Sequence, residues 1–481
     1  MKQARLIKPQ LMEARKRSKD IVDTISFVIP DHLRTLGNGL SYYIHTYGCQ
    51  GNEADSEKIK GILEDIGYTS SPNEEQADFI LLNTCAIRAN AENKVFGELG
   101  RLKHYKVKNP NLILAVGGCM PQEEVVVEKI LKTYHQVDLV FGTHNIHKIV
   151  DYLEILLSQK KKVIEVQSTQ GELIEHIPTV RTSKTKAWVN IMFGCDEFCT
   201  YCIVPYTRGK ERSRVPEHVL SEIRDLIQEG YQEVTLLGQN VNSYGLDFVD
   251  RQYTFANLLA DIQTLPIARV RFTTSHPKDF STDIITVLAK GGNLMPYIHL
   301  PVQSGSNRVL KAMNRKYTRE HYLQVVREIR QMIPHVSLTT DVIVGFPGET
   351  EVEFEETLSL MKAVQFEGAY TFIFSPRVGT PAAQFLDDVP HEIKKQRLHR
   401  LNELVNEQFK QGNLRFENTI VEVLVDGVSK TNQAVYSGYT PHNKLVNFVG
   451  KEEWIGQIIP VYIKKAKTWS LDGEVSDEIA R

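Results

Sequence analysis

Six cysteines are divided into two groups of three along the 481 residues of the chain. Cys195, Cys199 and Cys202 lie within eight positions, in "GCDEFCTYC". A closed structural zinc site takes four ligands, and no further cysteine follows this triplet. Iron–sulfur clusters are also held by cysteine thiolates, and three thiolates leave one iron open to an outside ligand. The triplet therefore predicts an open iron–sulfur site, with zinc completed by His276 or His299 as the alternative.

The other three cysteines each follow a short apolar run, in "YGCQ", "NTCA" and "GGCM". Their intervals of 36 and 34 residues each match one strand–helix unit. Open parallel sheets bind ligands at the carboxyl ends of their strands. We therefore expect Cys49, Cys85 and Cys119 to converge at one sheet edge. Three separately buried core cysteines are the alternative.

Composition places the chain among ordinary soluble proteins, with 42% hydrophobic residues, 24% charged residues and a net charge of −2. This balance excludes capture of nucleic acid by the whole protein's charge, although local basic patches remain possible. No apolar run is long enough to span a membrane, and the N-terminus lacks the apolar core of a signal peptide. Six cysteines in such a chain favour metal or catalytic thiols over disulfides, so we expect a cytoplasmic protein.

The elements that must position these cysteines form an α/β multidomain chain. Strands alternating with helices over 41–170 predict a parallel α/β domain of flavodoxin or Rossmann type. Six longer strand–helix units over 185–410 predict a partial (β/α)6 barrel with its site at the carboxyl face. Short alternating runs over 413–476 predict a small all-β barrel. Residues 1–40 are expected to form a basic, flexible extension.

Polar residues follow several predicted barrel strands and are candidates for ligand binding. They are Gln239 and Asn240 after the second strand, Ser275 and His276 after the third, and Gln303 and Ser304 after the fourth. The segment "YTRGKERSR" adds Arg208, Lys210, Arg212 and Arg214 close to the cysteine triplet. These four could dock RNA phosphates, or they could form a solvated charged turn.

The C-x3-C-x-aromatic-C motif after the first barrel strand resembles the radical S-adenosylmethionine superfamily. In that superfamily S-adenosylmethionine chelates the open iron, and one electron releases a 5′-deoxyadenosyl radical from it. The resemblance implies that Tyr201 contacts the adenine through its backbone. It also assigns "LPVQSGS" and "GFPGET" to the cofactor side, the latter containing Gly345, Gly348 and Glu349.

Residues 40–475 as a whole resemble the methylthiotransferases, which carry a second three-cysteine cluster in the N-terminal domain and a C-terminal TRAM domain that binds RNA. The resemblance implies two 4Fe–4S clusters, with the cluster at Cys49, Cys85 and Cys119 holding the sulfur that is transferred. "CTYCIVPYTRGKERSR" and "LLGQNVNSYG" favour the tRNA branch, which methylthiolates C2 of N6-isopentenyl (dimethylallyl) adenosine at position 37, next to the anticodon.

This resemblance implies a tRNA partner, an electron donor such as flavodoxin or ferredoxin, no membrane and a monomer. Three other functions remain open. The same chemistry could act on threonylcarbamoyladenosine in tRNA or on a ribosomal-protein aspartate. A non-catalytic RNA-binding protein with structural metal sites is the alternative from a different class.

Overall fold

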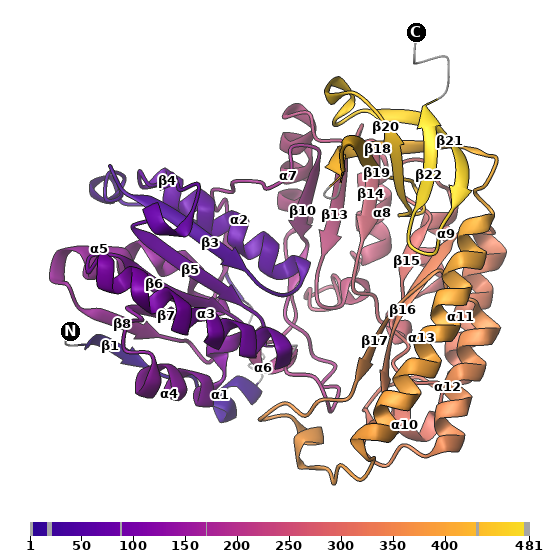
Figure 1. Ribbon diagram of the computed structural model, residues 1–481, viewed down its shortest axis with the longest axis horizontal. Helices are drawn as coiled ribbons and strands as arrows, with labels where there is room; N and C mark the ends of the chain where they lie inside the picture. Colours follow the sequence, from indigo (N-terminus) through magenta and orange to yellow (C-terminus); the bar gives the residue numbers. More distant parts are fainter. Residues whose placement is uncertain (1–2, 17–21, 87–88, 170, 430–431, 476–481) are drawn as a thin grey trace. The chain divides into compact units, whose positions relative to one another are not determined.

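The computed structural model describes residues 3–16, 22–86, 89–169, 171–429 and 432–475 (Figure 1). These residues form two compact units. The first unit lies within 1–182 and adds 192–214 and 377–380. The second comprises 183–191 and 215–376, and continues from 381 towards the C-terminus. Among the described helices, none is both long and apolar enough to cross a membrane.

The first unit is built on a parallel sheet with the strand order β1-β8-β7-β6-β5-β3-β4. Two adjacent strands in the middle of the sheet, β5 and β6, consist entirely of buried residues, as expected for a parallel sheet covered on both faces. The strands are β1 (Gln3–Ile7), β3 (Ser41–Thr46), β4 (Thr69–Ser70), β5 (Phe79–Thr84), β6 (Ile113–Gly118), β7 (Leu139–Phe141) and β8 (Lys162–Glu165).

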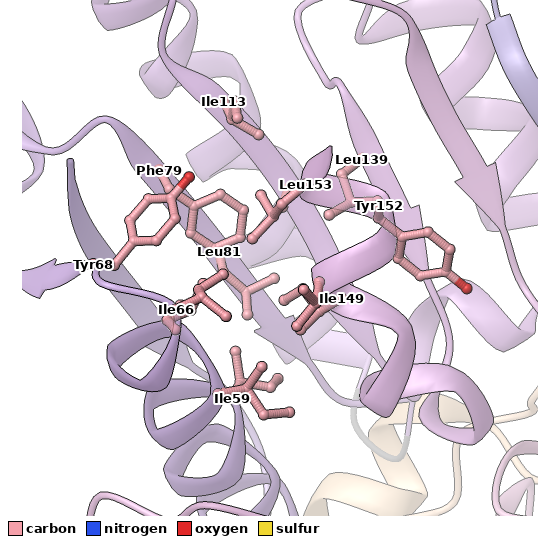
Figure 2. Close-up of a cluster of buried hydrophobic side chains, with 14 of the residues drawn as sticks. Ile59, Ile66, Tyr68, Phe79, Leu81, Ile113, Leu139, Ile149, Tyr152 and Leu153 are labelled. Atoms are coloured by element: carbon pink, nitrogen blue, oxygen red, sulfur yellow. The ribbon is translucent and has the colours of Figure 1, made fainter. Parts of the chain in front are cut away.

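Helices cover both faces of this sheet, and alternate residues of β5 divide between the two layers. Phe79 and Leu81 pack with α2 (Gln50–Asp65) and α5 (Ile149–Gln159), in the cluster that Figure 2 shows. Ile80 and Leu82 point the other way, into a second cluster with α3 (Ala89–Lys108) and α4 (Glu124–Thr133). Each such fully buried side chain contributes about 1.5–3 kcal/mol to stability. The result is a rigid support for the loops at the carboxyl ends of the strands.

The segment predicted as a flexible extension is folded where the structure describes it. Strand β1 pairs in parallel with β8, and Arg5 forms an ion pair of 2.9 Å with Glu165. Ile29 and Leu33 are buried in the α2–α5 cluster, and β2 (Thr24–Ser26) pairs with β9 (Leu173–Glu175). The prediction was wrong here because it weighed the basic residues and overlooked these short apolar runs. Residues 17–21, which carry part of the basic segment, lie outside the described residues.

The second unit contains the six strands of the predicted partial barrel, in two parallel groups of three. The first group is β10 (Lys186–Asn190), β13 (Glu233–Leu237) and β14 (Arg269–Phe272); the second is β15 (Tyr297–His299), β16 (Ser337–Val344) and β17 (Gly368–Ile373). The associated helices are α7 (Pro216–Gln228), α8 (Phe255–Gln263), α9 (Thr282–Ala289), α10 (Asn307–Ala312), α11 (Arg319–Met332), α12 (Glu351–Val364) and α13 (His391–Leu414).

A closed five-stranded barrel follows α13, with the strand order β18-β19-β20-β22-β21. Val423, Phe448 and Val461 are among the residues of its apolar core. The strands are β18 (Ile420–Ser429), β19 (Asn432–Tyr439), β20 (Leu445–Val449), β21 (Ile458–Ala466) and β22 (Leu471–Val475). The predicted fold class is therefore confirmed: a parallel N-terminal α/β domain, a partial α/β barrel and a small all-β barrel.

Two buried arginines at the start of β14 hold the small barrel on the larger one. Arg269, only 1% exposed, donates to the carbonyl oxygens of Tyr439 (2.7 Å) and Glu422 (3.2 Å). Arg271 donates to the carbonyl oxygens of Thr440 (2.8 Å) and Pro441 (2.9 Å), and its Nε lies 3.0 Å from Glu233 Oε2. The small barrel therefore docks at the amino-terminal ends of these strands, opposite the edge where barrel enzymes place their sites.

Candidate active site

Three cysteines lie at the carboxyl ends of neighbouring strands in the first unit. Cys49 follows β3 and is the N-cap residue of α2, Cys85 comes directly after β5, and Cys119 comes directly after β6. Because β6, β5 and β3 are adjacent in the sheet, the three thiols share one edge. Cys85 and Cys119 are buried, and Cys49 is partly exposed.

Asn52, a fully buried residue of α2, connects the three strand-end loops. Its Nδ2 donates to the carbonyl oxygens of Tyr47 (3.0 Å) and Thr84 (2.7 Å). Its Oδ1 lies 3.7 Å from the Cys49 thiol and 3.8 Å from the Cys119 thiol, and accepts hydrogen bonds from both. The amide therefore fixes two of the thiols relative to each other through one oxygen atom.

Gly48 lets the loops after β3 and β5 approach closely. Its φ of +117° favours glycine, and a Cβ at this position would lie 2.5 Å from Cys85 Cβ and 2.9 Å from Cys85 Sγ. Any larger residue would push the Cys85 side chain away from the other two thiols. The glycine preceding Cys49 is therefore part of the site.

The donor set fits an iron–sulfur cluster better than a single metal ion. Among the described residues, no three His, Cys, Asp or Glu side chains lie close enough to hold one ion. In a 4Fe–4S cluster each cysteine thiolate binds a different iron, so the sulfurs need not converge on one point. Burial raises the pKa of the Cys119 thiol to about 12, and cluster iron is a cation able to hold such a buried thiolate in its deprotonated form.

The second cysteine triplet lies on a loop of the same compact unit. The short strands β11 (Met192–Phe193) and β12 (Arg212–Ser213) pair in antiparallel fashion and close the base of this loop. Gly194 has a φ of +77°, and a Cβ there would meet the Lys210 carbonyl oxygen at 1.9 Å. Within the loop the Cys195 amide donates to the Gly209 carbonyl (3.1 Å), and the Cys202 amide donates to the Cys199 carbonyl (2.9 Å).

The triplet loop packs directly on the first cysteine group. Its short helix α6 (Val204–Thr207) carries Tyr206, which is buried with Ile203, Cys119 and Ala86 in one apolar cluster. Burial raises the pKa of the Cys195 thiol well above its usual value. Both cysteine groups are thus held by one framework, with apolar packing between the loop and Cys119.

Arg208 joins the triplet loop to the first cysteine group by hydrogen bonds. It is 8% exposed, and its Nη2 donates to Asn52 Oδ1 (3.0 Å) and to Asp55 Oδ2 (2.7 Å). Asp55 and the Cys119 and Cys49 thiols hold the pKa of the Arg208 guanidinium well above its ordinary value despite burial. A permanent positive charge therefore lies beside the Cys49 and Cys119 thiols.

Two arginines of the predicted phosphate-binding segment have carboxylate partners inside the protein. Arg208 pairs with Asp55 as described, and Arg214 is buried in a two-point ion pair with Glu175, at 2.7 and 2.5 Å. Both guanidinium groups already have internal carboxylate partners. Arg212 is 8% exposed and donates to the Gly171 carbonyl (3.4 Å), while Lys210 is partly exposed.

Sequence reasoning missed Asn52 and Asp55, although a signal for them exists. In "YGCQGNEADSE" the polar positions 52, 55 and 56 lie three and four residues apart, on one face of the predicted helix. A polar stripe that begins three residues after Cys49 indicates a helix whose first turns face a polar site. All three residues are buried in the structure.

Two predicted ligand residues of the second unit retain hydrogen-bonding capacity. Asn240, 1% exposed, donates to Asp279 Oδ2 (2.8 Å), while its Oδ1 has no partner among the described residues. Ser275 Oγ, which follows β14, is also buried without one. Buried polar atoms of this kind are normally satisfied by a ligand or by water. These two side chains therefore suit a bound polar ligand at the carboxyl ends of β13 and β14.

The other predicted cofactor residues play more varied parts. Glu349 accepts hydrogen bonds from the Gly345 amide (2.7 Å) and from Arg397 (2.9 Å), so its carboxylate shapes its own loop. Gly345 and Gly348 have φ values of +68° and +77°, as the turn requires. Gln239 and Tyr201 are both partly exposed. The backbone N–H of Gln303 donates to the Asp341 carbonyl oxygen (2.8 Å).

Three family models match successive parts of the chain. The Radical SAM superfamily matches residues 189–361, Uncharacterized protein family UPF0004 matches 41–142, and the TRAM domain matches 414–476. Among solved structures, the cobalamin-dependent S-adenosylmethionine radical enzyme OxsB, with aqua-cobalamin and S-adenosylmethionine bound, is similar in fold. It is 13% identical with a TM-score of 0.52, covering 77% of this chain and 56% of its own.

Close relatives extend over nearly the whole chain. The tRNA-2-methylthio-N(6)-dimethylallyladenosine synthase of Geobacillus kaustophilus is 58% identical over 471 residues, which cover 98% of this chain and 89% of the relative. The enzyme of the same name from Bacillus cytotoxicus is also 58% identical, covering 98% and 92%. With its radical SAM, UPF0004 and TRAM regions in the same chain, this protein belongs to the tRNA-2-methylthio-N(6)-dimethylallyladenosine synthase family.

Proposed function

We propose that this protein is a tRNA methylthiotransferase. It replaces the hydrogen on C2 of N6-isopentenyl (dimethylallyl) adenosine, at position 37 beside the anticodon, with a methylthio group. Family membership at 58% identity supports the substrate and the reaction. The observation that carries the proposal is that both cysteine groups lie in one compact unit, with Cys119 packed against Ile203 and Tyr206 of the triplet loop.

We propose two 4Fe–4S clusters, each held by three cysteines. Cys195, Cys199 and Cys202 would hold the one that binds S-adenosylmethionine, and Cys49, Cys85 and Cys119 the one that carries the transferred sulfur. Together these groups would supply radical chemistry, which an unreactive aromatic C–H bond requires and which no side chain can provide. The protein's own part is to position the clusters and the substrate and to exclude water from them.

Several side chains have defined parts in this positioning. Asn52 orients the Cys49 and Cys119 thiols, and Gly48 makes room for Cys85. Arg208 anchors the triplet loop to the same site. In the second unit, Asn240 and Ser275 offer buried polar atoms to a polar ligand.

The proposed reaction requires two partners, the tRNA substrate and an electron donor. We propose that the TRAM barrel contacts tRNA, and that a flavodoxin or ferredoxin delivers the electron. A tRNA substrate places the reaction in the cytoplasm. Each chain carries six cysteines, enough for both clusters, so we propose that a monomer is active.

Nucleoside analysis of tRNA tests the substrate. Cells lacking this protein should accumulate isopentenyladenosine without its methylthio group, and the wild-type gene should restore the modified nucleoside. The Cys199→Ala and Cys85→Ala variants should not restore it, whereas Lys103→Gln, an exposed site on α3, should.

Other outcomes would replace the proposal by a specific alternative. Loss of methylthio groups from threonylcarbamoyladenosine alone would identify that nucleoside as the substrate. Unchanged tRNA with an altered ribosomal-protein aspartate would identify a protein substrate. Colourless purified protein that contains zinc in place of iron would support a non-catalytic RNA-binding role.

A further inference from the structure

A buried ion pair connects the triplet loop to the first cysteine group. Arg208 of the triplet loop and Asp55 of α2 lie 2.7 Å apart, and they are 8% and 5% exposed. A buried ion pair is weak evidence for stability, because well-packed uncharged residues often hold such a contact equally well. What uncharged residues would not supply is the electric field of the two ions.

The guanidinium of Arg208 is separated from two of the cysteine sulfurs by a single amide oxygen. Its Nη2 donates to Asn52 Oδ1 (3.0 Å), and this oxygen lies 3.7 Å from Cys49 Sγ and 3.8 Å from Cys119 Sγ. Nη2 is therefore no more than about 7 Å from either sulfur, a distance at which a buried charge acts strongly. The same nitrogen atom donates to Asp55 Oδ2, so the cation and the anion of the pair both lie near the sulfurs.

Gly51, in the first turn of α2, keeps side-chain atoms out of the space between Arg208 and Cys49. A Cβ at this position would lie 3.6 Å from Cys49 Sγ and 3.7 Å from Arg208 Cζ. These are ordinary contact distances, so a larger residue here would extend from a point that touches both groups. The absence of a side chain leaves the cation and the sulfur as close neighbours.

A charge in this place affects how readily a cluster at these cysteines accepts an electron. The reduction potential of a 4Fe–4S cluster depends on the charges, the hydrogen bonds and the solvent exposure around it. Reduction adds one negative charge, so a nearby cation stabilises the reduced cluster and a nearby carboxylate destabilises it. Because both ions are buried, salt in the solvent screens them little.

We propose that Arg208 and Asp55 together set the reduction potential of the 4Fe–4S cluster held by Cys49, Cys85 and Cys119. Neither residue is a cluster ligand, and both act through their charge. The proposal rests on the proposed function, which supplies the cluster. Since Arg208 belongs to the loop that carries the other three cysteines, this loop contributes to the potential of the neighbouring cluster.

A redox titration that follows this cluster alone tests the proposal. The full-length anaerobic protein with Cys195→Ala, Cys199→Ala and Cys202→Ala combined provides the background, and electron paramagnetic resonance measures the reduced cluster at set potentials. Asp55→Asn and Arg208→Gln each remove one charge and keep a hydrogen-bonding group.

The two charge changes should act in opposite directions. Asp55→Asn should raise the ratio of reduced to oxidised cluster at a fixed potential, and Arg208→Gln should lower it. Each change should be about 10- to 50-fold, for a unit charge about 7 Å away and an effective dielectric constant of about 20–30. At 59 mV per tenfold for one electron, this is a shift of about 60–100 mV. The double variant has no net change in charge and should return towards the value of the background protein.

The ion pair of Lys106 and Asp138 provides the matched control. Its atoms are 2.6 Å apart, Asp138 is 2% exposed, and this residue directly precedes β7, so it lies at the opposite edge of the sheet from the cysteines. Asp138→Asn should change the ratio by no more than about twofold, because the charge is farther away.

The direction of the shifts separates an electrostatic role from a structural one. Iron analysis first establishes that each variant holds about four irons per chain. If Asp55→Asn leaves the ratio unchanged, or shifts it in the same direction as Arg208→Gln, the pair has a structural role only and the proposal is overturned. Wild-type protein that contains no iron would instead overturn the proposed function.

Discussion

At the scale of single residues, Arg208 joins the triplet loop to the first cysteine group through its bonds to Asn52 and Asp55. Replacing it with Met leaves the buried carboxylate of Asp55 without its cation, which costs about 3–5 kcal/mol of stability. The double variant Asp55→Asn with Arg208→Met should recover part of this loss, since no buried charge then remains. Urea unfolding of the single and double variants measures the effect. A single variant as stable as wild type would show that the ion pair is unimportant.

Glu123 gives a residue-scale prediction about pH. Burial raises its pKa to about 7, with Glu92 adding to the shift and Arg377 opposing it. Because the folded-state pKa is the higher one, the carboxyl favours folding below about pH 4.5, and this contribution is lost as pH rises through about 7. The Glu123→Gln variant removes this dependence. Its stability relative to wild type should increase by about 3 kcal/mol between pH 4.5 and pH 8, at 1.36 kcal/mol per pKa unit. Equal pH profiles in urea unfolding would contradict the prediction.

At the scale of elements, strand β14 attaches the small barrel to the larger one through Arg269 and Arg271. Arg271→Met removes two hydrogen bonds to the loop after β19 and leaves Glu233 buried without its partner. We expect faster limited proteolysis between α13 and β18, because the small barrel then loses part of its attachment to the larger barrel. Arg327→Met, at an exposed position on α11, is the matched control. Equal cleavage rates in the two variants would show that Arg271 does not hold the small barrel in place.

The strands also show which parts of the fold can be predicted from the sequence. Strands β5 and β6 are continuous apolar runs, and their positions and the cysteines at their ends could be predicted. Strands β1 and β9 are short, and their pairing is decided by partners about 150 residues away in the sequence, which no local pattern reports. Arg208 and Arg214 likewise have the pattern of a surface basic segment, and only the fold supplies Asp55 and Glu175 as their partners.

At the scale of the whole molecule, charge and cysteines are distributed unevenly. The net charge of −2 gives little overall attraction to RNA, so RNA recognition must come from local groups. All six cysteines fall in the first unit, and the barrel strands and the small barrel contain none. The two proposed clusters would thus both be held by one unit, and the other unit carries the barrel strands and the TRAM region.

This division predicts that the two cysteine groups can be inactivated independently. Cys85→Ala should retain about four irons per chain and should still cleave S-adenosylmethionine, because the triplet loop is closed by its own strands β11 and β12. It should form no methylthio product. Cys199→Ala should also retain about four irons and bind tRNA, but should not cleave S-adenosylmethionine. Iron analysis, cofactor cleavage and RNA binding are measured on the same anaerobic samples. Loss of all iron in either single variant would show that the two sites assemble as one, and normal cofactor cleavage in Cys199→Ala would remove the triplet from the radical chemistry.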